Sequence, residues 1–86
     1  NQRDALDRAL VDLTSFFRDV LVTSAGAAVP LANPDREADV RRAATEWSAE
    51  SALRRLEAVL ACREALDLNV KPEIAVEAMM TAIHTG

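Results

Sequence analysis

The stretch from Leu53 to Met80, LRRLEAVLACREALDLNVKPEIAVEAMM, decides the fold of this chain. It predicts a long amphipathic helix, a four-residue joint that ends at Pro72, and a short helix that is apolar almost all round. Pro72 suits the first position of a helix because its ring fixes φ and its missing N–H would be unpaired there. Asn69 can take the left-handed conformation that commonly ends a helix. A terminal helix this apolar must pack between other helices or against another chain. The stretch therefore indicates a role in protein packing and assembly and not a catalytic role.

The composition predicts one small helical domain over residues 1–86. Half of the residues are apolar, and the many alanines favour helices that approach one another closely. Chains of this size bury only about 60 to 65 per cent of their unfolded surface, so a partner would add stability. The chain begins at Asn1 rather than at Met, and we therefore expect a C-terminal fragment of a longer protein.

The charge and the cysteine count narrow the function. The net charge of −4 speaks against direct nucleic acid binding, because phosphate contacts need a basic surface. The single Cys62 and the single His84 exclude an internal disulfide and a Cys/His zinc site. No apolar run approaches the roughly 20 residues of a membrane span. We expect a cytoplasmic protein without a metal, a cofactor, a small-molecule substrate or a membrane partner.

Apolar residues recur at steps of three and four from Arg3 to about Thr23, which predicts the first helix. This stripe consists of Leu6, Leu10, Leu13, Phe17 and Val20. Asp19 lies off the stripe, together with the other polar residues of the segment. The segment Ala25–Asn33 has no period and contains a glycine and a proline, so it predicts a loop.

Start and stop signals predict three further helices. The string Asn33-Pro34-Asp35 places a capping side chain, a proline and an acid at a helix start, which predicts a helix over residues 34–46. Ser48 is a good cap for a helix that reaches Leu68, and the last helix spans residues 72 to about 84. The chain is therefore predicted to be all-α, a small bundle of four helices, or of five if the loop holds a turn.

One charged residue lies within the apolar face of the helix that ends near Leu68. Steps of about 100° per residue place six apolar residues on that face, namely Ala52, Leu53, Leu56, Val59, Leu60 and Leu66. Arg63 falls in the middle of the face, where an unpaired charge would be costly. It could form an ion pair with Glu77, or it could lay its methylenes on the core and reach water beside Asp67. Cys62 falls opposite the face, away from any expected cleft.

An enzyme alternative rests on the stretch from Arg3 to Val22, RDALDRALVDLTSFFRDVLV, which is similar to the first helix of AroQ-type chorismate mutases. Those enzymes grip a small dicarboxylate with arginines and a lysine, and Arg3 and Arg18 could take the arginine positions. The chain departs from the pattern because its only lysine, Lys71, lies in the joint beside a proline. No glycine-rich phosphate loop or other catalytic constellation is present.

Three parts of the chain follow one another in an order typical of a known family: Arg18–Leu21 (RDVL), Leu31–Asp35 (LANPD), and Leu66–Pro72 (LDLNVKP) followed by Ile74–Met79 (IAVEAM). Together they resemble the C-terminal domain of the DNA polymerase III delta-prime subunit, which is part of the bacterial clamp loader. The first two are similar to that family's Arg-Asp-leucine segment and Asn-Pro-Asp helix start. The last is similar to its Asn-Val-x-Pro and Leu-Ala-Leu-Glu ending, with Ile and Val where leucines are commoner.

The resemblance implies a clamp-loader collar-like domain without the ATPase-like region of the complete subunit. In that family the C-terminal domains of five related subunits pack into a ring, and the regions below the ring open and load the sliding clamp. It implies contacts with the gamma/tau and delta subunits, and no catalysis, nucleotide or metal in this domain. The alternatives are the collar domain of gamma/tau and a generic helical adaptor; residues 33–35 and 69–70 favour delta-prime.

Apolar residues on more than one side of the helices predict a surface for another subunit. Phe16 and Phe17 widen the apolar arc of the first helix, and Ile74 and Met80 lie on the last helix. We expect these four residues to contact a neighbouring subunit, so Phe16→Asp should weaken assembly and leave the isolated domain helical.

Overall fold

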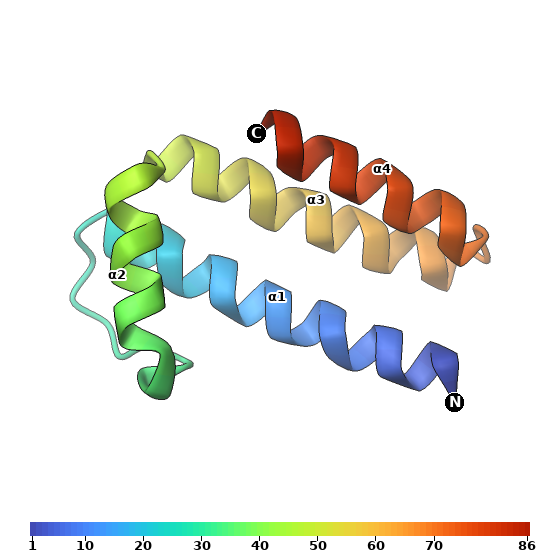
Figure 1. Cartoon of the computed structure of the whole chain (residues 1–86), viewed down its shortest axis with the longest axis horizontal. Coiled ribbons are helices and arrows are strands. Elements are labelled where there is room, and N and C mark those ends of the chain that lie inside the picture. Colours follow the sequence, from blue (N-terminus) through green and yellow to red (C-terminus); the bar gives the residue numbers. More distant parts are fainter.

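The computed structural model describes residues 1–86 and shows an all-α domain without strands (Figure 1). Its elements are α1 (Gln2–Ser24), the 3-10 helix η1 (Pro34–Arg36), α2 (Glu37–Glu46), α3 (Ala49–Asp67) and α4 (Pro72–Thr85). The predicted fold class is confirmed, and α1, α3 and α4 end within one residue of the predicted limits. The second predicted helix differs, because its first turn is a separate 3-10 turn.

The three long helices form one curved layer, with α3 between α1 and α4 (Figure 1). Each neighbour runs antiparallel to α3, and α2 crosses the end of the layer where α1 ends and α3 begins. The Cα atoms span 37 × 26 × 16 Å. The core is small, because only 11 of the 86 residues are buried.

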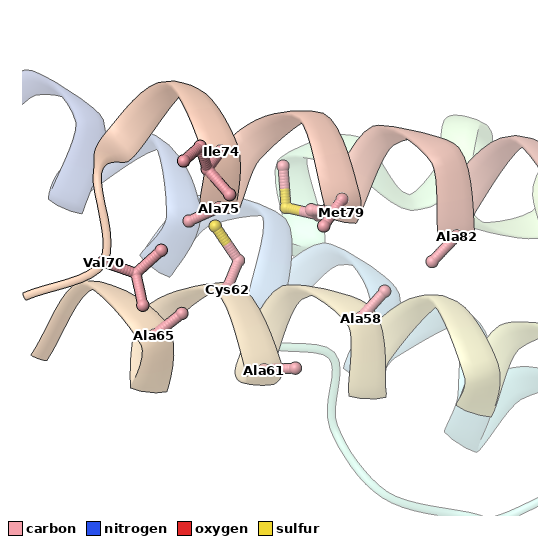
Figure 2. Close-up of a pocket in the computed structure, with 10 residues that line it drawn as sticks. Ala58, Ala61, Cys62, Ala65, Val70, Ile74, Ala75, Met79 and Ala82 are labelled. Atoms are coloured by element: carbon pink, nitrogen blue, oxygen red, sulfur yellow. The ribbon is translucent and has the colours of Figure 1, made fainter. Parts of the chain in front are cut away.

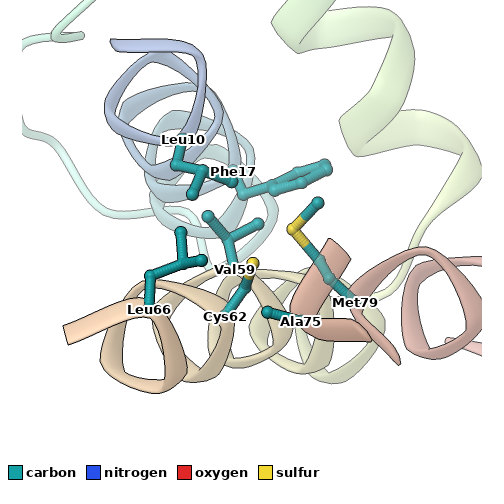
Figure 3. Close-up of a cluster of buried hydrophobic side chains, with 7 residues drawn as sticks. All are labelled: Leu10, Phe17, Val59, Cys62, Leu66, Ala75 and Met79. Atoms are coloured by element: carbon teal, nitrogen blue, oxygen red, sulfur yellow. The ribbon is translucent and has the colours of Figure 1, made fainter. Parts of the chain in front are cut away.

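The core consists of two clusters of buried side chains. The larger cluster joins α1, α3 and α4 (Figure 3) and consists of Leu10, Phe17, Val59, Cys62, Leu66, Ala75 and Met79. The smaller cluster joins α1, α2 and α3 and consists of Val20, Val40 and Ala52. Trp47 packs against both clusters, and the Arg55 guanidinium lies 4.1 Å from the centre of its ring. Trp47 therefore connects the crossing helix α2 to the layer.

Local chemistry explains most of the helix ends. Ser48 Oγ accepts a hydrogen bond from the Ser51 N–H at 3.1 Å, so the predicted cap of α3 is confirmed. Asn69 has a φ of 66°, the left-handed conformation predicted for the joint, and Pro72 occupies the first turn of α4. Asn33 makes no side-chain cap hydrogen bond at η1. Its predicted capping role is wrong because its amide group binds a carboxylate of α1 instead.

The buried side of α3 differs from the predicted apolar face. Cys62 was expected to lie opposite that face, but it is buried in the larger cluster, whereas Leu53 and Leu60 are exposed. The prediction was wrong because α3 has two neighbours. Its buried arc must face the space between α1 and α4, and this direction does not coincide with the side that carries most of the leucines.

The joint between α3 and α4 gives the first testable prediction. Asn69→Val should lower the free energy of unfolding by about 1–2 kcal/mol, because a β-branched residue disfavours the left-handed conformation. Asn69→Gly should keep it within about 0.5 kcal/mol of the natural value. Thermal unfolding followed by circular dichroism should show roughly 4–8 °C of lost Tm per kcal/mol for a domain of this size. Equal Tm values for the two variants would contradict this account of the joint.

Candidate interaction surface

A groove runs along the seam between α3 and α4 (Figure 2). It has a volume of about 210 Å³, and all of its ten lining residues are hydrophobic. They are Ala58, Ala61, Cys62, Ala65, Val70, Ile74, Ala75, Ala78, Met79 and Ala82. Six of the ten are alanines, and their short side chains leave the seam hollow where longer ones would fill it.

The groove has a buried floor and an exposed rim. Cys62, Ala75 and Met79 belong to the core and form the floor. Val70 and Ile74 lie at the end near the joint (Figure 2), and Ile74 is 60% exposed. Burial raises the pKa of the Cys62 thiol, so this residue stays protonated and serves as a small apolar side chain. The groove is therefore an apolar surface without a reactive group.

Met80 is also exposed, at 54%, but it belongs to another side of α4. Six residues separate it from Ile74, which places the two side chains roughly 120° apart around the helix. Of the four residues predicted from the sequence to contact a neighbour, Ile74 is the one that lines the groove.

The two phenylalanines of α1 make their contacts inside the domain. Phe17 is buried, and its ring centre lies 5.8 Å from that of Phe16 in an edge-to-face arrangement. Phe16 is half-buried, packs against both core clusters and lies 4.5 Å below the Arg36 guanidinium. The segment around η1 and α2 covers this side of α1, so the structure does not offer the phenylalanines as a free surface. Phe16→Asp is accordingly expected to destabilise the domain, in contrast to the expectation from the sequence.

Arg63 points to α1 and not to α4. Its Nη1 donates a hydrogen bond to Thr14 Oγ1 at 3.2 Å, and Thr14 Oγ1 donates to the Leu10 carbonyl at 2.7 Å. The predicted ion pair with Glu77 is not formed, because Glu77 is exposed on α4. Arg63 is half-buried, as expected for the alternative in which it lies along the core and reaches water. Its partner in that position is Thr14 and not Asp67.

Asp19 is the one charged residue in the core, although the sequence pattern places it on the polar side of α1. Its side chain is fully buried. Oδ1 accepts a hydrogen bond from the Ala32 N–H at 2.8 Å, and Oδ2 accepts from the Asn33 N–H at 2.8 Å and from Asn33 Nδ2 at 2.9 Å. Arg18 Nη1 lies 3.0 Å from Oδ1 and also donates to the Pro30 carbonyl at 3.2 Å. The carboxylate therefore ties the end of the loop to α1.

These contacts keep Asp19 ionised. Burial alone would raise its pKa, but the hydrogen bonds from Ala32, Asn33 and Arg18 outweigh burial, and the pKa lies below the ordinary value of 3.8. The carboxylate also joins two of the stretches that resemble a known family, residues 18–21 and residues 31–35. The presence of both stretches in the family resemblance was the sequence signal that could have pointed to the contact of Asp19 with the loop. Helical periodicity alone gives no reason to bury Asp19.

Arg3 and Arg18 do not converge on one cleft. Arg3 forms ion pairs with Asp7 at 3.0 Å and with Asp67 at 3.8 Å, whereas Arg18 binds Asp19. Arg18 lies 15 positions after Arg3, which corresponds to roughly 22 Å along a helix. Within one copy of the chain, these two arginines therefore do not form the cluster of basic groups around one small substrate that the chorismate mutase-like alternative needs.

Two further observations concern other kinds of site. No group of three or more His, Cys, Asp or Glu side chains comes together where it could hold a metal ion. No helix combines the length and the apolar character that crossing a membrane requires.

Comparison with protein families gives a match over nearly the whole chain. The family model described as DNA polymerase III, delta subunit, C terminal, matches residues 1–85. Comparison with curated proteins and with solved structures gives no match. The groove and the Asp19 anchor both lie within the matched residues.

Asp19 gives a prediction about acid stability. Because its pKa is lowered in the folded state, its stabilising contribution is present above the unfolded pKa of about 3.8 and is lost as the pH falls through the folded pKa. Asp19→Asn replaces one carboxylate oxygen, a hydrogen-bond acceptor, with an amide NH2 group. This donor would face the N–H groups of Ala32 and Asn33. At pH 7 this should lower the free energy of unfolding by about 1–3 kcal/mol.

The measurement is denaturant unfolding between pH 7 and pH 3, followed by Trp47 fluorescence. The difference between the natural protein and Asp19→Asn should shrink below pH 3.8. Asp12→Asn is the matched control, because Asp12 is an exposed carboxylate of the same helix. A constant difference across the pH range would show that the charge of Asp19 does not stabilise the loop.

Proposed function

We propose that this chain, which belongs to the family of C-terminal domains of the DNA polymerase III delta subunit, is a non-catalytic assembly domain of the bacterial clamp loader. In this proposal it is the collar domain of a delta-prime subunit. Its role is to hold that subunit in the ring of related subunits that places the sliding clamp on DNA.

The apolar groove between α3 and α4 carries this proposal. A seam lined entirely by hydrophobic residues, with Ile74 exposed at its rim, is unfavourable in contact with water. The domain does not cover the groove itself, because the side chain of Ile74 at its rim remains 60% exposed. A neighbouring subunit would cover it and create the apolar centre that is typical of permanent subunit interfaces.

Two parts of the chain favour the delta-prime subunit over gamma/tau. Residues 31–35 (LANPD) supply the loop end that binds Asp19, and residues 66–72 (LDLNVKP) supply the joint with its left-handed Asn69. Each therefore has a structural role that a related protein would need to keep. A generic helical adaptor would account for the groove but not for these two parts together. We propose gamma/tau and delta as partners, no direct contact of this domain with nucleic acid, and a cytoplasmic location.

A change at the groove rim tests the assembly role. Ile74→Glu in the full-length protein should raise the Kd for the other clamp-loader subunits at least about tenfold, which corresponds to about 1.4 kcal/mol. The reason is that the new carboxylate would be buried without a partner in the interface. Size-exclusion chromatography with light scattering, over a range of protein concentrations, measures this Kd.

Val11→Glu is the matched control, because Val11 is also an exposed apolar residue of a helix, on α1 and outside the groove. Both variants should unfold within about 0.5 kcal/mol of the natural protein, since both sites face water. The proposal would be falsified by a natural protein that forms no complex with gamma/tau and delta.

A further inference from the structure

We propose that the groove between α3 and α4 receives a single amphipathic helix of a neighbouring subunit. This helix carries large apolar residues at steps of three and four, with lysines or arginines along both flanks. The inference rests on the proposed assembly function and adds the chemistry of the partner.

The spacing of the alanines points to a helix as the occupant. The groove alanines lie at positions 58, 61 and 65 of α3 and at positions 75, 78 and 82 of α4, and Cys62, Ile74 and Met79 complete the helical lining. Both sets of alanines follow steps of three and then four, the spacing with which helices interlock in coiled coils. Short side chains on both walls leave holes, and these holes fit the large apolar side chains of a third helix laid along the seam.

The length of the seam sets the length of the occupant. A second hollow shares Ala58 and Ala82 with the groove and continues past Thr85 to Gly86, and its charged lining residues are Arg54 and Glu57. The extended seam therefore follows α4 from its start near the joint to its end. The 14 residues of α4 correspond to roughly 21 Å, so the occupant is a helix of about four turns.

Charge defines the flanks of the occupant. Glu57 and Glu64 lie on α3, seven residues apart, and each is a neighbour in sequence of a groove alanine. On α4, Glu77 lies beside the groove residue Ala78, whereas Glu73 lines a separate hollow with Arg3 on the α1 side of α4. Glu57, Glu64 and Glu77 are exposed, and none of the three takes part in any of the ion pairs of the domain. Basic side chains on both edges of the incoming helix would pair with them.

The same charges argue against a second copy of this chain as the occupant. Two copies joined groove to groove would bring the glutamates of one copy toward those of the other, and each chain carries a net charge of −4. Repulsion between like charges at an interface costs affinity. A partner with basic flanks removes this repulsion and gains the pairs.

The test uses the full-length protein with the other clamp-loader subunits and compares three variants. Ala61→Phe with Ala78→Phe fills the groove from both walls at positions that are exposed in the domain. Glu57→Lys with Glu64→Lys reverses the charge of one flank. Asp12→Lys with Glu46→Lys is the matched control, because it makes the same change in net charge at two exposed acids outside the groove.

Light scattering at several protein concentrations gives the Kd of each complex. We expect the groove-filled variant and the flank-reversed variant to raise the Kd at least about tenfold, and the control to leave it within about twofold. The natural complex should also weaken as salt rises from about 0.05 to 0.5 M, because salt screens the flanking pairs. Circular dichroism confirms that each variant keeps its helices.

Each other outcome overturns a distinct part of the inference. If the groove-filled variant assembles as tightly as the natural protein, the groove is not the docking site, while the assembly function stands. Unchanged or tighter binding by the flank-reversed variant excludes basic flanks on the partner. Self-association of the natural protein that groove filling abolishes identifies a second copy as the occupant. Failure of the natural protein to assemble at all removes the proposed function itself.

Discussion

The structure depends on α3 having a neighbour on each side. Val59, Cys62 and Leu66 of this helix face the space between α1 and α4, and they provide the centre of the larger core cluster. Ala52, one turn into the helix, packs against Val20 of α1 and Val40 of α2 in the smaller cluster. With the three long helices in a single layer, no second layer exists to cover a helix that loses its contact with α3. Replacing the buried residues of α3 with smaller ones would therefore leave cavities that disturb both clusters. Closely packed interiors relax only in part around a cavity.

A polar anchor complements this apolar layer. The loop between α1 and η1 has few buried side chains, so apolar packing cannot fix its path. Asp19 fixes it through hydrogen bonds to the backbone of Ala32 and Asn33. A buried carboxylate is costly unless its oxygens are satisfied, and here both oxygens accept at least two contacts. The path of the loop that leads to α2 is therefore fixed by a charge, whereas α2 itself and the layer are held by apolar contacts.

The features that the sequence predicted correctly are those that depend on neighbouring residues in the chain. The four helices follow from periodicity, and the Ser48 cap and the left-handed Asn69 follow from local hydrogen bonding and backbone sterics. The errors concern contacts between distant segments. Cys62 was misplaced because periodicity does not reveal that a helix has two neighbours, and Asp19 because a polar residue on an amphipathic helix is normally exposed.

The candidate site was only partly predictable for the same reason. An almost entirely apolar last helix indicated a contact surface, and Ile74 is part of the groove. The phenylalanines of α1 were large and apolar enough to suggest an interface, yet α2 folds back over them. No local pattern in α1 records that α2 returns to this side, because the turn that directs it depends on the Asp19 anchor. The alanines were seen as helix formers, whereas their main consequence is the hollow seam that they leave together.

The alanine lining also reconciles solubility with assembly. A groove lined by leucines or phenylalanines would expose a large apolar area and promote non-specific association. Alanine exposes little apolar surface at each position, so the free domain presents a shallow hollow bordered by unpaired glutamates. In an assembly of the proposed kind, the large apolar residues come from the partner, and most of the buried area arises only when the two surfaces meet. Affinity then depends on the fit of the partner helix, and the glutamates favour partners with the complementary charge. Such a surface would select its partner in the proposed assembly by shape and charge together.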